Sequence, residues 1–174
     1  SKDDYFIDEG ADPDYSNPPP QEFNPFAVYD ATGALTRLEY PSVIAHHEER
    51  LYLAAPSYQG TVKRPVAVLG SALGNYTNFD EVPIPDAADA ITFELAASRH
   101  EVVRAMKSTE QALIILTSFA EWLVRGSGDS EVITPLSIWA HPFAFHGSAA
   151  SPDALQVSNA IFFVHASGAT PRLL

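Results

Sequence analysis

The apolar residues of this chain occur in short runs, and that pattern limits the fold more than any other feature of the sequence. Residues 113–116 are a clear example, because these four apolar residues lie among small and polar neighbours within the stretch 111–126. A run this short is typical of a strand buried on both faces, since helices need longer segments. Residues 117–120 then form an expected turn, and residues 121–124 return with Trp122 as an aromatic anchor. We predict a β-hairpin here.

A similar pattern occurs three times along the chain. Residues 66–72, 111–118 and 160–168 each combine an apolar run with a following serine, and Ser71, Ser118 and Ser167 are 47 and 49 residues apart. A repeat of roughly 40–50 residues with several short strands is typical of β-propeller blades. Unrelated hairpins in a β-sandwich are the alternative, because such runs are also common there.

Many other short segments have strand character. They are residues 26–29, 42–46, 50–55, 66–70, 91–95, 102–106, 132–134, 136–140 and 160–164, with another beginning at 172. A helix over the alanine-rich residues 86–106 competes with two of these strands, but the alternation in 91–95 and the β-branched residues favour strands. We predict an all-β fold of β-propeller-like blades, short antiparallel strands forming a partial propeller, with a β-sandwich as the alternative.

The chain divides into two regions by composition. Residues 1–25 contain seven acidic residues, one lysine and a run of three prolines, which predicts an acidic, proline-rich extended arm. A spacer is the favoured interpretation of that arm, and a proline-rich ligand for a signalling domain is the alternative. Residues 26–174 form the expected all-β domain of about three blade-like repeats. Since the chain begins at Ser1 and ends within an expected strand, we expect it to be a piece of a longer protein.

Composition argues against several classes of function. The net charge of −12 does not suit a protein that grips nucleic acid, because neutralising phosphates needs clustered Lys and Arg. It is compatible with a surface past which DNA slides, since like charges repel. No apolar run approaches the ~18 residues of a membrane helix, so we predict no membrane insertion. The absence of cysteine excludes thiol catalysis, disulfides and Cys-ligated zinc.

The most reactive-looking cluster is His46-His47-Glu48-Glu49. On a strand, His46 and Glu48 would share one face and His47 and Glu49 the other, so the four side chains could not converge on one metal. The histidine spacing of zinc proteases is also absent. We therefore favour a solvated turn, with a metal-dependent hydrolase centred on His46 and His47 as an alternative.

Other candidate sites are weaker. His141 and His146 could meet across a turn, but aromatic packing explains the segment 141–146 equally well. Residues 128–130 resemble the start of some esterase motifs, yet no strand precedes them and the G-x-S-x-G pattern is absent. Asp86 and Asp89 could bind calcium or serve as turn acids. We predict no catalytic, cofactor-binding or metal-binding residues, no cofactor and no enzymatic activity.

Four aromatic residues offer a different kind of site. Trp122, Trp139, Tyr76 and Phe79 could form a sugar-stacking surface, although their expected places in strands and turns favour core packing. A carbohydrate- or receptor-binding β-domain is therefore our alternative function.

Several short segments follow one another along the chain in an order that resembles a known family. They are N-P-F at 24–26, a strand–polar pair–Arg-Leu–strand unit at 40–54, S-A-L-G-N-Y-T-N-F at 71–79, D-A-I-T-F at 89–93, L-T-S-F-A-E-W at 116–122 and I-T-P at 133–135. In this order they resemble the tail tube, nozzle or packaged-DNA stabilisation proteins of short-tailed bacteriophages. The resemblance covers about residues 24–174. Asn75 stands where the family often has aspartate, and Phe119 where it usually has glycine.

The resemblance implies β-propeller architecture and a structural component of the phage tail, a nozzle or hub below the portal that forms part of the DNA-exit conduit. The implied partners are other copies of the chain in a ring and other tail or portal proteins, with DNA passing without tight or specific binding. The implied location is the virion tail, after synthesis in the bacterial cytoplasm. About three blades cannot close a propeller, which needs at least four, so we expect the last strand to present an unpaired edge.

Overall fold

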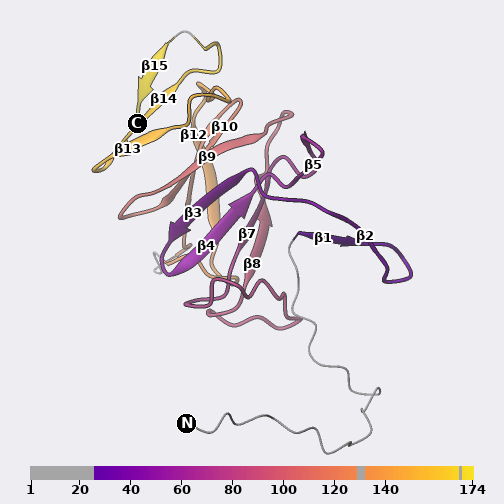
Figure 1. The fold of residues 1–174 in the computed structure, drawn as a ribbon. Helices are drawn as coiled ribbons and strands as arrows, with labels where there is room; N and C mark the ends of the chain where they lie inside the picture. The colour runs from indigo at the N-terminus through magenta and orange to yellow at the C-terminus, as the bar shows by residue number, and fades with distance from the viewer. Residues whose placement is uncertain (1–25, 129–131, 169) are drawn as a thin grey trace, which may run out of the picture.

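The computed structural model describes residues 26–128, 132–168 and 170–174, and this part of the chain is built from antiparallel β-sheets (Figure 1). No helix forms within these residues, which confirms the all-β prediction and makes the alternative of a helix over residues 86–106 wrong. Accordingly, the same residues contain no helix that could cross a membrane. The expected acidic arm, residues 1–25, lies outside the described residues.

The first sheet has four strands that pair in chain order: β3 (Val43–His47), β4 (Arg50–Ala54), β7 (Ala67–Gly70) and β8 (Ile91–Glu94). These strands match the predicted ones closely. The predicted loop at 57–65 contains an additional small hairpin, β5 (Ser57–Tyr58) and β6 (Thr61–Val62), which the sequence analysis missed. Its turn uses Gln59 and Gly60, both with positive φ. A two-residue turn of this kind matches the twist of a hairpin.

The second sheet is also a four-stranded meander: β9 (Val103–Ser108), β10 (Leu113–Thr117), β11 (Glu121–Arg125) and β12 (Trp139–Ala144). The predicted central hairpin is β10–β11 and is confirmed. The strands predicted at 132–134 and 136–140 are wrong, because Thr134 and Ser137 form an isolated bridge and the strand begins only at Trp139. Pro142 is tolerated within β12 because β12 is the outer strand, where a missing N–H leaves no ladder bond unmade.

The third sheet has only three strands: β13 (Leu155–Val157), β14 (Ala160–Val164) and β15 (Pro171–Leu173). A separate hairpin pairs β1 (Ala27–Tyr29) with β2 (Leu35–Leu38). Its turn is stabilised by Asp30, whose carboxylate accepts hydrogen bonds from the backbone of Thr32 and Ala34. The Thr32 hydroxyl also donates to this carboxylate, and that hydrogen bond, more than the two from the backbone, lowers the pKa of Asp30.

The three sheets stack in chain order. One core cluster joins the first two sheets, with Tyr52, Val68 and Ile91 packed in the same cluster as Ile115 and Trp122. A second cluster joins the last two sheets through Ala105, Ile114, Leu116, Ile161 and Phe163. Successive four-stranded meanders packed face to face are the arrangement of propeller blades. Within the described residues the third sheet lies at one end of the stack, at the upper left of Figure 1.

The three serines of the predicted repeat do not occupy equivalent positions in the three sheets. Ser118 and Ser167 follow the second strands of their sheets, β10 and β14, whereas Ser71 follows the third strand of its sheet, β7. The sequence analysis treated Ser71 and Ser118 as equivalent because the strands that precede them, β7 and β10, are both buried along their whole length. Burial on both faces gives second and third strands the same apolar pattern, so the sheets repeat but these serines do not mark equivalent positions.

Candidate functional site

The predicted histidine–glutamate cluster does not converge on one point. His46 is exposed and lies 3.2 Å from the Tyr76 hydroxyl, whereas His47 is buried and lies 2.8 Å from Ser108 Oγ. Glu48 accepts a hydrogen bond from the backbone N–H of Ile133 at 2.8 Å. No group of three His, Asp or Glu side chains in the described residues could hold a metal ion. The cluster is therefore a structured turn between β3 and β4, and it contacts the second sheet.

The other residues considered as candidate sites do not come together as a site either. Because β12 runs straight through residues 139–144, no turn brings the two imidazoles together: His141 stacks on Trp139 with ring centroids 5.2 Å apart, and His146 lies 6.5 Å from His165. Asp86 and Asp89 act as turn acids, since Asp89 Oδ2 accepts the Asp86 N–H at 2.7 Å. Of the segment 128–130, only Gly128 lies within the described residues.

A buried arginine that the sequence analysis did not single out anchors the first sheet. Arg50 is completely buried at the start of β4. Its guanidinium donates to the carbonyl oxygens of Ser71 at 2.7 Å, Asp89 at 2.6 Å and Ala87 at 2.5 Å. Hydrogen bonds from a charged donor are the stronger kind, so one side chain fixes both ends of the long loop between β7 and β8. Burial lowers the pKa of Arg50 from its ordinary value.

The surrounding hydrogen bonds complete this anchor. The Ser71 hydroxyl accepts the N–H of Leu51 at 3.0 Å, and the N–H of Gly74 donates to the carbonyl of Glu49 at 2.9 Å. Glu48 and Glu49 both have positive φ, at 48° and 58°, in the two-residue turn. Such values are unfavourable for residues other than glycine, and these tertiary hydrogen bonds help to hold the turn.

A comparable buried network stabilises the second sheet. Glu101 is buried, and its Oε2 accepts hydrogen bonds from Thr117 Oγ1 at 2.6 Å and from Trp122 Nε1 at 3.1 Å. Thr117 Oγ1 in turn accepts the N–H of Ala120 at 2.8 Å, which closes the β10–β11 turn.

The four residues of the predicted aromatic surface are divided between the core and the exterior. Trp122 and Phe79 are buried, as expected for core residues, while Trp139 and Tyr76 are exposed.

One face of the third sheet is apolar and exposed. The strand register places seven residues on its outer face, the face turned away from the second sheet, and every one of them is apolar: Leu155, Val157, Ala160, Phe162, Val164, Pro171 and Leu173. Four of these are large side chains that are 44–62% exposed. Residues 148–174 contain only one acid, Asp153, and one base, Arg172, in a chain of net charge −12. This face is the candidate interaction surface of the molecule.

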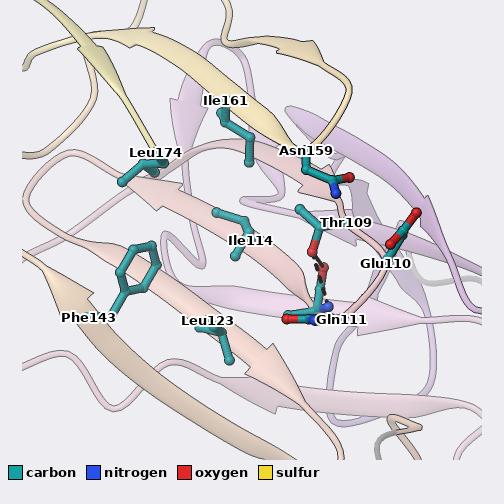
Figure 2. A pocket seen from close by; sticks show the side chains of 10 residues that line it. Thr109, Glu110, Gln111, Ile114, Leu123, Phe143, Asn159, Ile161 and Leu174 are labelled. Carbon is teal, nitrogen blue, oxygen red and sulfur yellow. Dashed lines mark hydrogen bonds between the residues drawn. The ribbon is translucent and has the colours of Figure 1, made fainter.

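A cleft lies beside the same sheet, between it and the second sheet. Its volume is about 320 Å³. Figure 2 shows Ile114, Leu123 and Phe143 from the second sheet facing Ile161 and Leu174 from the third. Thr109, Glu110, Gln111, Ala112 and Asn159 line the rest of the cleft. The lining is mostly apolar with a few polar groups, as is usual for a binding groove.

An exposed row of aromatic rings continues from the cleft along β12. Trp139, His141 and Phe143 are the exposed residues of this strand, in which exposed and half-buried residues alternate. Trp139 also lies under the guanidinium of Arg125, at 4.9 Å from the ring centroid. The third sheet packs against Ile114 and Leu116 of β10 and leaves these rings on β12 exposed. The row could offer stacking surfaces to a planar or apolar ligand.

No protein-family model and no curated protein matches the chain.

The sequence analysis missed the exposed apolar face of the third sheet for identifiable reasons. The apolar pattern of residues 155–164 predicts strands but cannot say which face is covered. The one available signal was that both faces of β14 are apolar, from Ala160 to Val164, in a segment with little charge. A strand with this composition needs a covering layer on each side, and the described part of the chain supplies only one.

Proposed function

We propose that this chain is a non-enzymatic structural component of the tail of a short-tailed bacteriophage, part of a nozzle or hub below the portal. The observation that carries the proposal is that three of the segments that resemble the phage family are joined by hydrogen bonds in the structure. Segments 40–54, 71–79 and 89–93 are separate in sequence, yet Arg50 from the first bonds to the carbonyls of Ser71 and Asp89 from the other two. Segments that build one sheet need a fixed order and spacing along the chain, so the hydrogen bonds between these segments support the resemblance.

The mechanism we propose is mechanical. Sheets that stack in chain order build the wall of a conduit, and the apolar outer face of the third sheet makes a contact with another subunit of the ring. Two copies of so acidic a chain repel each other over most of their surface, and they can approach most closely where charge is lowest. An acidic wall would let DNA pass with little adhesion, because phosphates and carboxylates repel each other.

The mass of the chain in solution tests this function. Light scattering of the chain alone and with tail or portal proteins should reveal a ring or a higher oligomer. Phe162→Glu places a charge in the middle of the apolar face and should reduce assembly. Ile84→Glu makes the same change at a residue that is 90% exposed elsewhere on the molecule, and it should leave assembly unchanged. A wild-type monomer at all concentrations, indifferent to those partners, would contradict the proposal.

The aromatic row on β12 supports a second candidate, carbohydrate or receptor binding. Since Trp122 is buried and Trp139 is 41% exposed, a change in tryptophan fluorescence on adding oligosaccharides would report mainly on Trp139. The change should disappear in Trp139→Ala. A fluorescence spectrum that stays constant across a panel of oligosaccharides would count against this candidate.

A further inference from the structure

The first strands of the three sheets come together on one side of the stack. β3 packs beside β9. The third sheet joins them through Gln156 of β13, whose Nε2 donates to the carbonyl of Ser108 at the end of β9, at 2.6 Å. A small pocket of about 150 Å³ lies at this junction. It is separate from the cleft between the second and third sheets, because the two share no lining residue.

Two basic side chains line this pocket. Arg104 and Lys107 come from β9, and Ser42, the residue before β3, adds a hydroxyl. Asp153 is the one acidic residue in the lining, and the remaining lining residues are apolar: Val43, Ile44, Ala105 and Met106. Ten of the 174 residues of the chain are basic, so two bases at one small pocket are a local exception to a net charge of −12.

A β-bulge sets Arg104 outside the regular pairing of β9. Leu116 pairs with Ala105 and Thr117 with Val103, so Arg104 is the extra residue. Bulges are common beside functional sites, where they redirect a side chain. The Nε of Arg104 is buried and has no hydrogen-bond partner within the described residues. A buried charged donor is costly unless it has an acceptor, so its burial calls for one.

Other arginines of the chain do have acceptors. Arg50 donates to three carbonyl oxygens, and Arg37 lies 2.6 Å from the carboxylate of Glu39. None of the ion pairs in the described part of the chain involves Arg104.

The second base of the pocket is only weakly engaged. Lys107 lies 3.4 Å from Asp153 Oδ2, but that carboxylate is 72% exposed, and exposed ion pairs contribute little. A stronger acceptor could therefore displace Asp153 from Lys107.

From this geometry we propose that the pocket binds a small oxyanion of the phosphate class, with Arg104 and Lys107 as its charged donors and Ser42 as a neutral one. Guanidinium N–H groups match phosphate oxygens, and an ammonium adds a point charge. This site goes beyond the structural role proposed above, which needs no ligand.

The size of the pocket limits the ligand. Sites for organic ligands usually measure ~300–1,000 Å³, whereas a water molecule takes up ~30 Å³. A volume of about 150 Å³ therefore suits a single ion with a few water molecules and excludes a nucleotide. The net charge of −12 also repels a polyanion over most of the surface. The ligand is therefore a free ion.

Titration with inorganic phosphate tests the site. The whole chain is kept in a buffer without phosphate or sulfate, and sodium chloride holds the ionic strength constant, because screening alone changes surface electrostatics. NMR follows the Nε–H resonance of Arg104, which reports directly on a new acceptor. We expect a saturable shift of that resonance, together with a thermal midpoint that rises with phosphate concentration.

Variants locate the bound ion. Arg104→Met should weaken phosphate binding by at least about tenfold, because it removes charged hydrogen bonds, and it should still fold, because it removes a buried charge that has no partner. Lys107→Gln should also weaken binding and serves as a second variant. Arg172→Met removes the same kind of charge at an exposed position and should leave the affinity within about twofold of wild type.

Asp153→Asn supplies a readout that a merely structural role would not move. It removes the carboxylate that competes for Lys107 and keeps an oxygen that can accept the N–H of Ala154. Phosphate should therefore bind at least about twofold more tightly to this variant, because a like charge beside the ion is lost.

Several results would overturn the proposal. They are the absence of a saturable shift in the wild-type chain, equal affinity of wild type and Arg104→Met, and weaker binding to Asp153→Asn. A single-stranded oligonucleotide without a terminal phosphate should not displace the bound phosphate, because sugars flank each of its phosphates. Displacement would overturn the assignment to a free ion. Since none of these measurements depends on ring assembly, failure of the proposed tail function would not affect them.

Discussion

Replacing Arg50 should destabilise the fold more than almost any other single substitution. Its guanidinium donates to three backbone carbonyls, and its side chain is completely buried. Arg50→Met keeps a long apolar side chain but removes every donor. It therefore leaves the carbonyls of Ser71, Ala87 and Asp89 without the donors that hold them.

The magnitude follows from opposing contributions. A hydrogen bond to a charged group contributes ~1.5–3 kcal/mol, so three of them would amount to roughly 4.5–9 kcal/mol. Removing the charge also removes its desolvation cost, which is several kcal/mol. We expect Arg50→Met to lower the free energy of unfolding by about 4 kcal/mol, a large part of the ~5–15 kcal/mol available to a domain.

Urea denaturation followed by tryptophan fluorescence measures this loss. With an m-value of ~2 kcal/mol/M, the midpoint should fall by about 2 M. Arg50→Lys retains the charge but has a single ammonium, so it should fall between Met and wild type. Lys63→Met, at an exposed position, should stay within ~0.5 kcal/mol of wild type. Limited proteolysis should also show faster cleavage between residues 71 and 90 in Arg50→Met.

A loss below about 1 kcal/mol in Arg50→Met would refute this reasoning. It would mean that water satisfies the three carbonyls as well as the guanidinium does. Unchanged proteolysis of the loop would lead to the same conclusion.

Three further predictions concern other parts of the fold. Glu101→Ala leaves Trp122 Nε1 without its acceptor, whereas Thr117 Oγ1 can still donate to the Ala120 carbonyl, so the free energy of unfolding should fall by ~1–3 kcal/mol in urea, with a red shift of tryptophan emission. Burial lowers the pKa of His47 from 6.5, with Glu48 opposing and His46 reinforcing the shift. The unfolded chain therefore takes up that proton first, and stability should decrease as pH falls below about 6.5. His47→Gln should reduce this decrease in urea midpoints measured between pH 7.5 and 5.5, while the exposed control His100→Gln should not. Gly147 has φ of +70° and an added Cβ would lie 2.5 Å from Ser118 O, so Gly147→Ala should lower the thermal midpoint more than Gly168→Ala, whose Cβ has open space.

The strands could be predicted from sequence because each depends on local information. The alternation in residues 91–95 and the unbroken run at 113–116 report directly on how many faces of a strand are buried. Both became strands with nearly the predicted bounds, β8 and β10. The β12 strand was misplaced because Pro142 counts against a strand unless the strand lies at an edge, and edge position depends on pairings elsewhere in the chain.

The tertiary features could not be predicted in the same way. Arg50 follows two glutamates in a hairpin turn, and nothing local indicates that it is completely buried or that its acceptors lie near residues 71 and 89. The cleft is less predictable still, because Phe143 and Leu174 approach each other only through the stacking of two sheets. Arg50 does lie within the segment 40–54, one of those on which the predicted resemblance to phage tail proteins rests.

Two properties coincide on the third sheet, and their coincidence is informative. Its outer face is wholly apolar, and the sheet lies in a segment where acid and base balance. Either of these alone would be unremarkable, since surface apolar residues are common on monomers. Together they describe a face built to be covered, because an exposed apolar face with little charge around it promotes association.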